Sequence, residues 1–165
     1  MQKVKSLRGK WLNVAFSLTA LLVVVADQLS KTWIRSNLVV GQSLPETGFF
    51  RLTHIHNTGA AFGLFRDQSF ILTIVALVGI VVLLLYALFI YRRFPILDNR
   101  LGKSALGLVL GGTVGNLIDR IRLGYVTDFI DVGVWPAFNI ADSVIVVGAI
   151  ILAYSLRSLA RAEKY

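Results

Sequence analysis

Cysteine is absent from this 165-residue sequence, and histidine occurs only twice. Thiol nucleophiles and disulfide bonds are therefore excluded, and cysteine usage says nothing about the redox compartment. The two histidines, His54 and His56, lie close together but lack the spacing of any metal-ligand motif. We therefore expect no metal and no other cofactor, so any chemistry has to come from the remaining polar side chains.

Polar sequence is scarce as well, because 56% of the residues are hydrophobic and the mean hydropathy is +0.71. A soluble fold could not bury so large an apolar fraction. Four apolar stretches, at residues 11–30, 68–91, 104–121 and 137–156, each approach the ~20 residues that cross a bilayer. The sequence predicts a mainly α-helical membrane protein, one domain over residues 1–165 with four transmembrane helices.

Basic residues outnumber acidic ones by 17 to 9, a bias that can indicate nucleic-acid binding. Eleven of the 17 fall in the N-terminal tail, the connection between the second and third spans, and the C-terminal tail. By the positive-inside rule these three segments face the cytoplasm, and residues 33–67 and 122–136 form outward loops. The charge therefore indicates orientation, with both termini cytoplasmic, and we expect no nucleic-acid partner.

The first apolar segment follows a basic tail and so also has features of a cleavable secretory signal. Its apolar run is long for such a signal, and three further apolar segments follow it. We interpret it as a transmembrane helix.

The outward loops carry sequence that is typical of β-strands. FFRLTHIHN at residues 49–57 is rich in such residues with imperfect alternation, and YVTDFI at 125–130 alternates well enough for a short strand or extended turn. Glycines and a proline between these segments supply turns. We expect short strands folded over the membrane surface rather than a separate domain.

Acidic residues interrupt three of the four apolar stretches. Asp27, Asp119 and Asp142 lie 15 to 17 positions from the nearest cytoplasmic basic residue of their own helix. With a rise of about 1.5 Å per helical residue, all three lie about 22–25 Å from the cytoplasmic basic residues. This depth is just below the outer surface of a hydrocarbon core of about 30 Å. Asp128 and Asp131 follow the third span on the same side, so five of the nine acidic residues gather there.

Each of these acids has a structural explanation when it is taken singly. The candidate pairs are Asp27 with Lys31, Asp119 with Arg120 or Arg122, and Asn139 as a helix cap with Asp142. Carboxylates within a span are costly, however, and several at one depth favour a shared functional role.

The chemistry open to such a cluster is that of a carboxylate pair. Two Asp side chains at close range share a proton, so one can activate water while the other donates to a scissile carbonyl. Asp142 has three possible partners by spacing, namely Asp119, Asp128 and Asp131. The sequence predicts amide hydrolysis at a wet membrane edge, with the partner of Asp142 left open.

Five ordered motifs resemble those of lipoprotein signal peptidase, also called signal peptidase II, a family of bacterial membrane aspartyl endopeptidases. They are DQLSK (27–31), NTGAAFG (57–63), GNLIDR (115–120), GYVTDF (124–129) and FNIAD (138–142). The resemblance covers nearly the whole chain from Asp27 to the start of the fourth apolar segment. Five blocks in the same order make chance agreement improbable.

The resemblance implies a set of roles and a substrate. Asp128 and Asp142 would be the catalytic pair and Asp27 a structural residue, with supporting polar residues at Asn57, Asn116, Asp119, Arg120 and Asn139. The substrate would be a prolipoprotein whose cysteine bears diacylglyceryl, cut on the amino side of that cysteine. The implied setting is the bacterial inner membrane with the site on its extracytoplasmic face, and we expect a monomer surrounded by membrane lipid.

The implied fold has four helices, a small β-rich cradle and a short surface helix on the outer face. One departure is the connection from Asp128 to Asp142, which is 14 positions long and shorter than in some relatives, so the loop over the site would be smaller. Two other classes remain as alternatives: an ion or proton transporter, and a non-catalytic membrane assembly module. Transport requires polar residues through the whole bundle, whereas the inner halves of these segments are almost wholly apolar.

Overall fold

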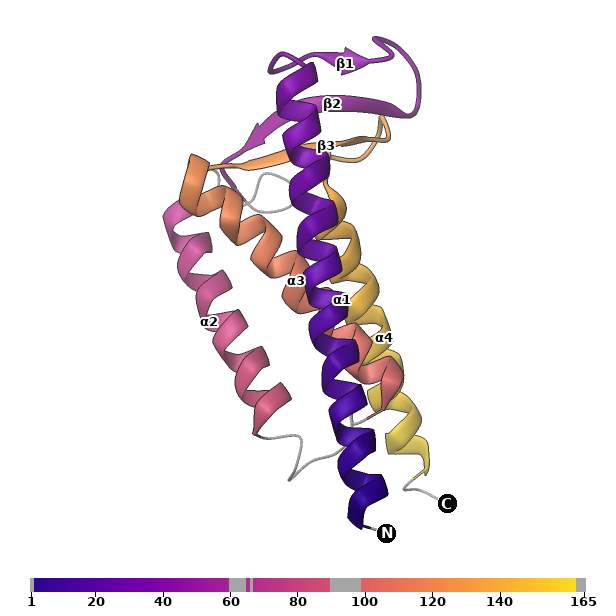
Figure 1. Cartoon of the computed structure of the whole chain (residues 1–165). Helices are drawn as coiled ribbons and strands as arrows, with labels where there is room; N and C mark the ends of the chain where they lie inside the picture. The colour runs from indigo at the N-terminus through magenta and orange to yellow at the C-terminus, as the bar shows by residue number, and fades with distance from the viewer. Residues whose placement is uncertain (1, 60–64, 66, 90–98, 163–165) are drawn as a thin grey trace.

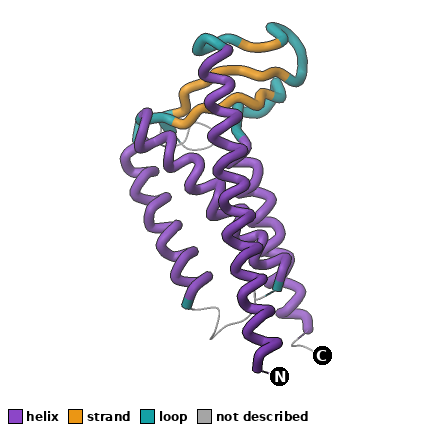
Figure 2. Tube along the Cα trace, in the orientation of Figure 1, coloured by secondary structure: helices purple, strands orange, loops and turns teal. Residues whose placement is uncertain are grey.

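The computed structural model describes residues 2–59, 65, 67–89 and 99–162. In chain order its elements are α1 (Gln2–Asn37), β1 (Ser43–Leu44), β2 (Arg51–Asn57), α2 (Ser69–Leu88), α3 (Arg100–Leu123), β3 (Val126–Asp131) and α4 (Ile140–Ala162). The four helices form a bundle with a small sheet at one end, and both termini lie at the opposite end (Figures 1 and 2).

All four helices are long and apolar enough to cross a membrane, over Leu12–Asn37, Ser69–Ala87, Arg100–Leu123 and Ile140–Ser158. The predicted number of spans is therefore confirmed, although the ends differ. The first helix runs well beyond the predicted 11–30 at both ends, because charged residues that end an apolar run need not end a helix. Residues 90–91 of the second predicted span lie outside the described residues.

Helix α3 is the centre of the bundle, with 61% of its span buried compared with 6% for α2. Glycines on two faces of α3 allow the neighbouring helices to approach it closely. A Cβ at Gly107 or Gly111 would lie 2.7 Å from a backbone oxygen of α1, and one at Gly112 would lie 2.6 Å from the Ala141 oxygen of α4. Gly107 and Gly111 thus allow close packing against α1, and Gly112 on a second face of α3 does the same for α4.

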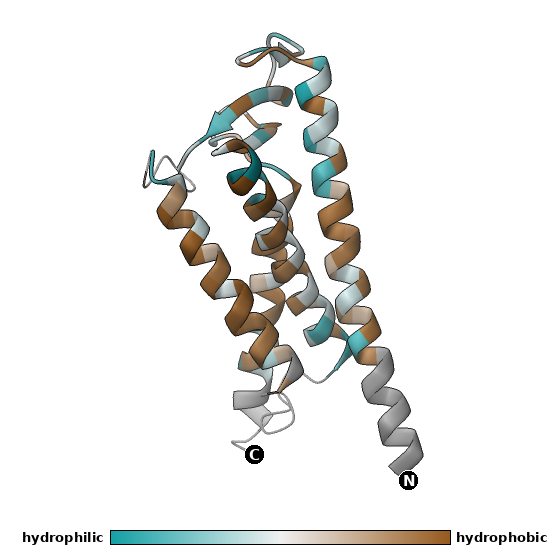
Figure 3. Ribbon diagram, turned by 60° about the vertical axis from the view of Figure 1, so that its left-hand side comes forward, coloured by the Kyte–Doolittle hydropathy of each residue, from teal (hydrophilic) through white to brown (hydrophobic). Residues whose placement is uncertain are grey.

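Helix α2 is predominantly apolar along its length, as the brown colouring of the side visible in Figure 3 shows. It packs on the outside of the bundle through Ile80, Leu83 and Leu84, which contact a small buried cluster that includes Phe16 and Leu106. Most of its other large side chains are exposed. Such a surface suits lipid rather than water.

The sheet is antiparallel with strand order β1-β2-β3. It is attached to the top of α1, because Ile34 and Leu38 pack with Phe129 of β3 and His54 Nδ1 lies 2.8 Å from the Leu38 carbonyl oxygen. The register aligns Ile55 with Asp128 and Asn57 with Val126. The two predicted strand segments are therefore found, and their pairing fixes Asp128 beside the last residues of β2.

The expected short surface helix is absent from the described parts of the two outer loops, which contain strands and turns. Residues 60–64 and 66 of the first loop lie outside the described residues. The small sheet is thus the structure that covers this end of the bundle.

Candidate active site

Four aspartates from four different elements meet where the sheet joins the bundle. Asp27 lies on α1, Asp119 on α3, Asp128 on β3 and Asp142 in the first turn of α4. Asp27, Asp119 and Asp128 are almost fully buried, and Asp142 is partly buried. The depth argument therefore correctly grouped these acids, and their partners divide them into two sets.

Asp128 and Asp142 are held by amide N–H groups. Asn57 Nδ2 donates to Asp128 Oδ2 at 2.8 Å, and Asn139 Nδ2 donates to Asp128 Oδ1 at 2.7 Å. Asn116 Nδ2 donates to Asp142 Oδ1 at 2.8 Å, and the Asn139 backbone N–H donates to Asp142 Oδ2 at 3.2 Å. Each of the four carboxylate oxygens thus accepts an N–H.

The start of α4 explains why Asn139 can serve both aspartates. Its Oδ1 accepts the Asp142 backbone N–H at 2.9 Å while Asp142 accepts the Asn139 N–H in return, the reciprocal pattern of a capping box. This confirms the expected cap. Because the cap occupies Asn139 Oδ1, the Nδ2 group must point away from the helix, and it reaches Asp128. One residue therefore begins the helix and links the two carboxylates.

A second amide is oriented by the chain that follows β2. Asn57 Oδ1 accepts the Gly59 backbone N–H at 2.9 Å, which directs its Nδ2 to Asp128. The Gly59 carbonyl in turn accepts from Arg120 Nη2 at 3.2 Å. Among the described residues the buried Arg120 Nε has no hydrogen-bond partner.

Asp128 and Asp142 both line a cavity of ≈ 740 Å³. Its polar wall includes Asn57, Asn116 and Arg120. The apolar wall is formed by Trp135, Pro136, Phe138, Ile145 and Val146, among others. No sequence pattern distinguishes this apolar wall, because its residues come from a loop and from a largely apolar helix.

The environment of Asp128 favours a retained proton. Burial raises the pKa of Asp128 to about 7, and the negative charge of Asp142 adds to the rise. Hydrogen bonds from Asn57 and Asn139 act in the opposite direction on the same pKa but do not cancel the increase. A carboxyl group that titrates near neutrality can both give and take a proton.

Asp27 and Asp119 have cations as partners instead. Lys31 Nζ is 2.8 Å from Asp27 Oδ2 and 3.4 Å from Asp119 Oδ2, and all three side chains are buried. Arg35 Nη1 lies 3.5 Å from Asp119 Oδ1. We call Asp27, Lys31, Arg35 and Asp119 the charged cluster. Its members carry two positive and two negative formal charges.

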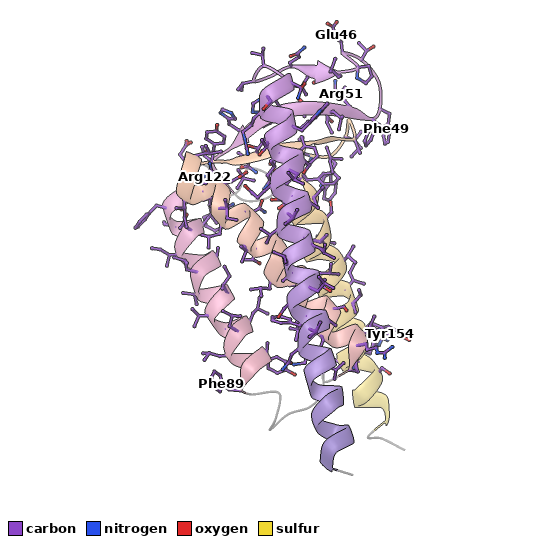
Figure 4. All side chains as sticks on the ribbon, viewed as in Figure 1. Glu46, Phe49, Arg51, Phe89, Arg122 and Tyr154 are labelled. Carbon is purple, nitrogen blue, oxygen red and sulfur yellow. The ribbon has the colours of Figure 1, made fainter. Side chains whose placement is uncertain are left out.

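The charged cluster also holds the site together. Asp119 accepts the Thr127 backbone N–H of β3 at 3.0 Å, and Asp27 accepts the Ala141 N–H of α4 at 3.0 Å. The expected pair of Asp27 and Lys31 is confirmed. The expected pairing of Asp119 with Arg120 or Arg122 is wrong, because Arg120 turns to the cavity and Arg122 is exposed at the end of α3 (Figure 4).

Asp131, one of the three open partners of Asp142, lies elsewhere. It pairs with Arg51 across the sheet and accepts the Gly133 N–H, and it is not among the residues that line the cavity. Asp119 is taken up by the charged cluster. Asp128 is therefore the carboxylate that shares the cavity with Asp142.

The two histidines have structural partners. His56 stacks on Tyr125 with ring centroids 3.6 Å apart, and its edge meets His54 at 5.0 Å. Burial lowers the pKa of His56, with contributions from His54 and Arg35. Within the described ranges, no three His, Cys, Asp or Glu side chains are grouped so as to hold a metal ion.

Comparisons with known proteins agree with this geometry. The family model for signal peptidase (SPase) II matches residues 19–157. Lipoprotein signal peptidase of Dehalococcoides mccartyi strain CBDB1 is 53% identical over 138 residues, covering 84% of this chain and 86% of that protein. The Moorella thermoacetica lipoprotein signal peptidase is 48% identical over 143 residues, covering 86% and 91% of the two chains.

Solved structures give the same result at the level of the fold. One, a bacterial membrane enzyme determined by the in meso method at 2.3 Å resolution, superposes with a TM-score of 0.76 at 31% identity, covering 86% of each chain. A second, at 1.9 Å resolution, gives a TM-score of 0.72 at 31% identity, covering 84% of this chain and 90% of that one. Since the family model and these relatives cover most of its length, this multi-pass membrane protein belongs to the signal peptidase II family.

Proposed function

We propose that the chain is an aspartic endopeptidase that removes signal peptides from diacylglyceryl-modified prolipoproteins, with Asp128 and Asp142 as its catalytic pair. The family membership supports the activity. The assignment of the pair rests on one observation, which is that both carboxylates line the same cavity and are held there by amides rather than by cations.

The reaction needs one proton on the pair. One carboxylate takes a proton from the attacking water as the water oxygen bonds to the scissile carbonyl carbon, while the other gives its proton to the carbonyl oxygen. The tetrahedral species then collapses as the first carboxylate protonates the departing nitrogen and the second recovers a proton from the diol. The C–N bond breaks, and the pair returns to its starting state.

The neighbouring residues have supporting roles in this proposal. Asn57, Asn116 and Asn139 hold the carboxylates in position through the hydrogen bonds described above. Arg120 lines the cavity, and a guanidinium group there is suited to a peptide carbonyl of the substrate. Asp27 and Asp119 act through the charged cluster, which ties α1, α3, β3 and α4 together.

The substrate class fits the cavity. Its apolar wall, which includes Trp135, Ile145 and Val146, suits acyl chains and apolar residues of a signal peptide. Cleavage would fall on the amino side of the lipidated cysteine. We further propose a monomer in the bacterial inner membrane, with cytoplasmic termini and the site on the extracytoplasmic face. The orientation is supported by the excess of basic residues in both tails and in the connection between the second and third spans.

The test uses the purified full chain in detergent with a diacylglyceryl-modified precursor and the same precursor without lipid. We expect cleavage of the modified precursor, and a loss of more than about 10³-fold in Asp128→Asn and in Asp142→Asn. Asp131→Asn is the matched control, since Asp131 is a strand carboxylate outside the cavity, and its activity should stay within about threefold.

Three results would count against the proposal. Equal turnover of both precursors would remove the dependence on lipid. Substantial activity in Asp128→Asn or Asp142→Asn would exclude that residue from the pair. A folded wild-type protein that cleaves neither precursor would contradict the peptidase activity itself.

A further inference from the structure

The side-chain amide of Asn116 connects the charged cluster to the carboxylate pair. Its Oδ1 accepts from Lys31 Nζ at 2.8 Å and from Asn139 Nδ2 at 3.2 Å. Its Nδ2 donates to Asp142 Oδ1 at 2.8 Å. Asn116 therefore has a charged partner on each side, a cation at its oxygen and a carboxylate at its nitrogen.

These partners define which way the amide faces. A lysine ammonium has three N–H donors and no acceptor, so the atom of Asn116 nearest to it has to be the oxygen. The opposite orientation would direct the amide NH₂ at the ammonium and the amide oxygen at Asp142. Lys31 thus fixes the orientation of Asn116, and the ammonium also polarises the amide and strengthens its N–H as a donor.

Lys31 is well suited to this task because it cannot move. Its side chain has no exposed surface and is held by Asp27 at 2.8 Å and Asp119 at 3.4 Å. Arg35 balances the second of these carboxylates, so the charged cluster has no formal net charge. Its effect on the pair therefore comes mainly from the amide it orients and less from a long-range field.

Building on the proposed function, we propose that Lys31 is a positioning residue, which acts through Asn116 to hold the Asp142 carboxylate in place for proton transfer. The oriented Asn116 amide donates to Asp142 Oδ1, and the Asn139 backbone N–H donates to Oδ2. Both oxygens of Asp142 are thus held, one of them through Lys31.

The inference predicts what happens when the ammonium is lost. In Lys31→Met the Asn116 amide has no cation at its oxygen and can rotate, and the rotated amide presents its oxygen to Asp142. An amide oxygen cannot donate to a carboxylate, so Asp142 would lose the contact that holds its Oδ1 in place. Substrate binding to the cavity walls should be little affected.

The experiment measures kcat and KM for a lipid-modified precursor. In Lys31→Met we expect kcat to fall by about 10- to 100-fold, the worth of one hydrogen bond to a charged group, with KM within about threefold. Lys103→Met is the matched control, because Lys103 is also a buried lysine on a membrane-spanning helix but lies near the start of α3, at the opposite end from Asp119. It should retain kcat.

A third variant protects the test against loss of folding. Lys31→Met leaves the buried Asp27 without its cation, whereas Asp27→Asn/Lys31→Met keeps the charges balanced, and its kcat should be as low as in the single Lys31→Met variant. The inference is overturned if the double variant regains the wild-type kcat, if KM rises as much as kcat falls, or if Lys103→Met loses as much kcat as Lys31→Met. Loss of activity in Asp128→Asn and Asp142→Asn alongside any of these results would leave the proposed function standing.

Discussion

The site contains two pairs of aspartates that differ in what surrounds them. Asp27 and Asp119 contact the ammonium of Lys31, and Asp119 also contacts Arg35. Asp128 and Asp142 form no ion pair within the described residues and accept from three asparagines instead. Both pairs are next to each other at the same end of α3, so depth in the membrane does not explain the difference.

The difference lies in what each partner does to a proton. A cation at contact distance keeps a buried carboxylate ionised, and the pair then serves as a fixed structural link. An amide satisfies the same oxygens without adding charge, so two neighbouring carboxylates can retain one proton between them. The first arrangement suits a scaffold and the second suits acid–base chemistry.

The strongest way to break this comparison is to neutralise one member of each pair. Asp119→Asn leaves two cations facing one carboxylate and removes an acceptor of β3, so we expect a loss of about 3–5 kcal/mol in the free energy of unfolding. Asp142→Asn removes a negative charge next to the Asp128 carboxyl group, and it should change the free energy of unfolding by less than about 1 kcal/mol. Thermal or denaturant unfolding in detergent compares them, and equal losses would contradict the distinction.

The pH dependence of stability gives a second, smaller effect. The pKa of Asp128 is about 7 in the folded protein against an ordinary 3.8, so the folded state binds more protons and its stability falls as pH rises through this window. Asp128→Asn removes that dependence. Its stability relative to wild type should increase by about 2–4 kcal/mol between pH 4 and pH 7 and then level off.

The measurement is unfolding of both proteins at several pH values, and the change with pH is the result that matters. A constant offset is expected as well, because an asparagine at 128 cannot accept from Asn57 and Asn139 at the same time. A difference that does not change with pH would contradict a proton-sharing pair.

The smallest effect concerns the packing that supports the charged cluster. A Cβ at Gly115 would lie 2.5 Å from Asp27 Oδ2, so Gly115→Ala should cost about 1–3 kcal/mol. Gly79→Ala on α2 is the control, since nothing lies within 4 Å of its Cβ, and it should be neutral or stabilising by up to about 1 kcal/mol. Thermal unfolding of the two variants tests this, and equal stability would argue against tight packing at Gly115.

Much of the architecture follows from sequence. Apolar stretches close to bilayer length predict the four helices, and the spacing of Asp27, Asp119 and Asp142 from cytoplasmic basic residues predicts that they share a level. The cap at Asn139 is readable because the residue three positions on is acidic. These features involve neighbouring residues, or depend only on depth along the membrane normal, so they can be predicted from the sequence.

The partners of each carboxylate are a different matter. Asp119 forms ion pairs with residues 84 and 88 positions away in α1 and not with its sequence neighbour Arg120. The rotation of α3 about its axis, and not proximity in sequence, decides which of its faces meets α1. Spacing alone likewise left Asp119, Asp128 and Asp131 as equal partners of Asp142. The register of β2 with β3 and the pairing of Asp131 with Arg51 distinguish them, and a single sequence does not report either.

Helix α2 supplies no residue to the cavity or to the charged cluster, and it lies on the outside of the bundle. Its outer face is therefore a natural attachment point for fluorophores, spin labels or fused tags that leave the chemistry undisturbed. Labels at exposed positions such as Val78 and Val82 would allow the protein to be immobilised or followed in a bilayer. The same positions should accept many different residues, provided that these residues are apolar enough for contact with lipid.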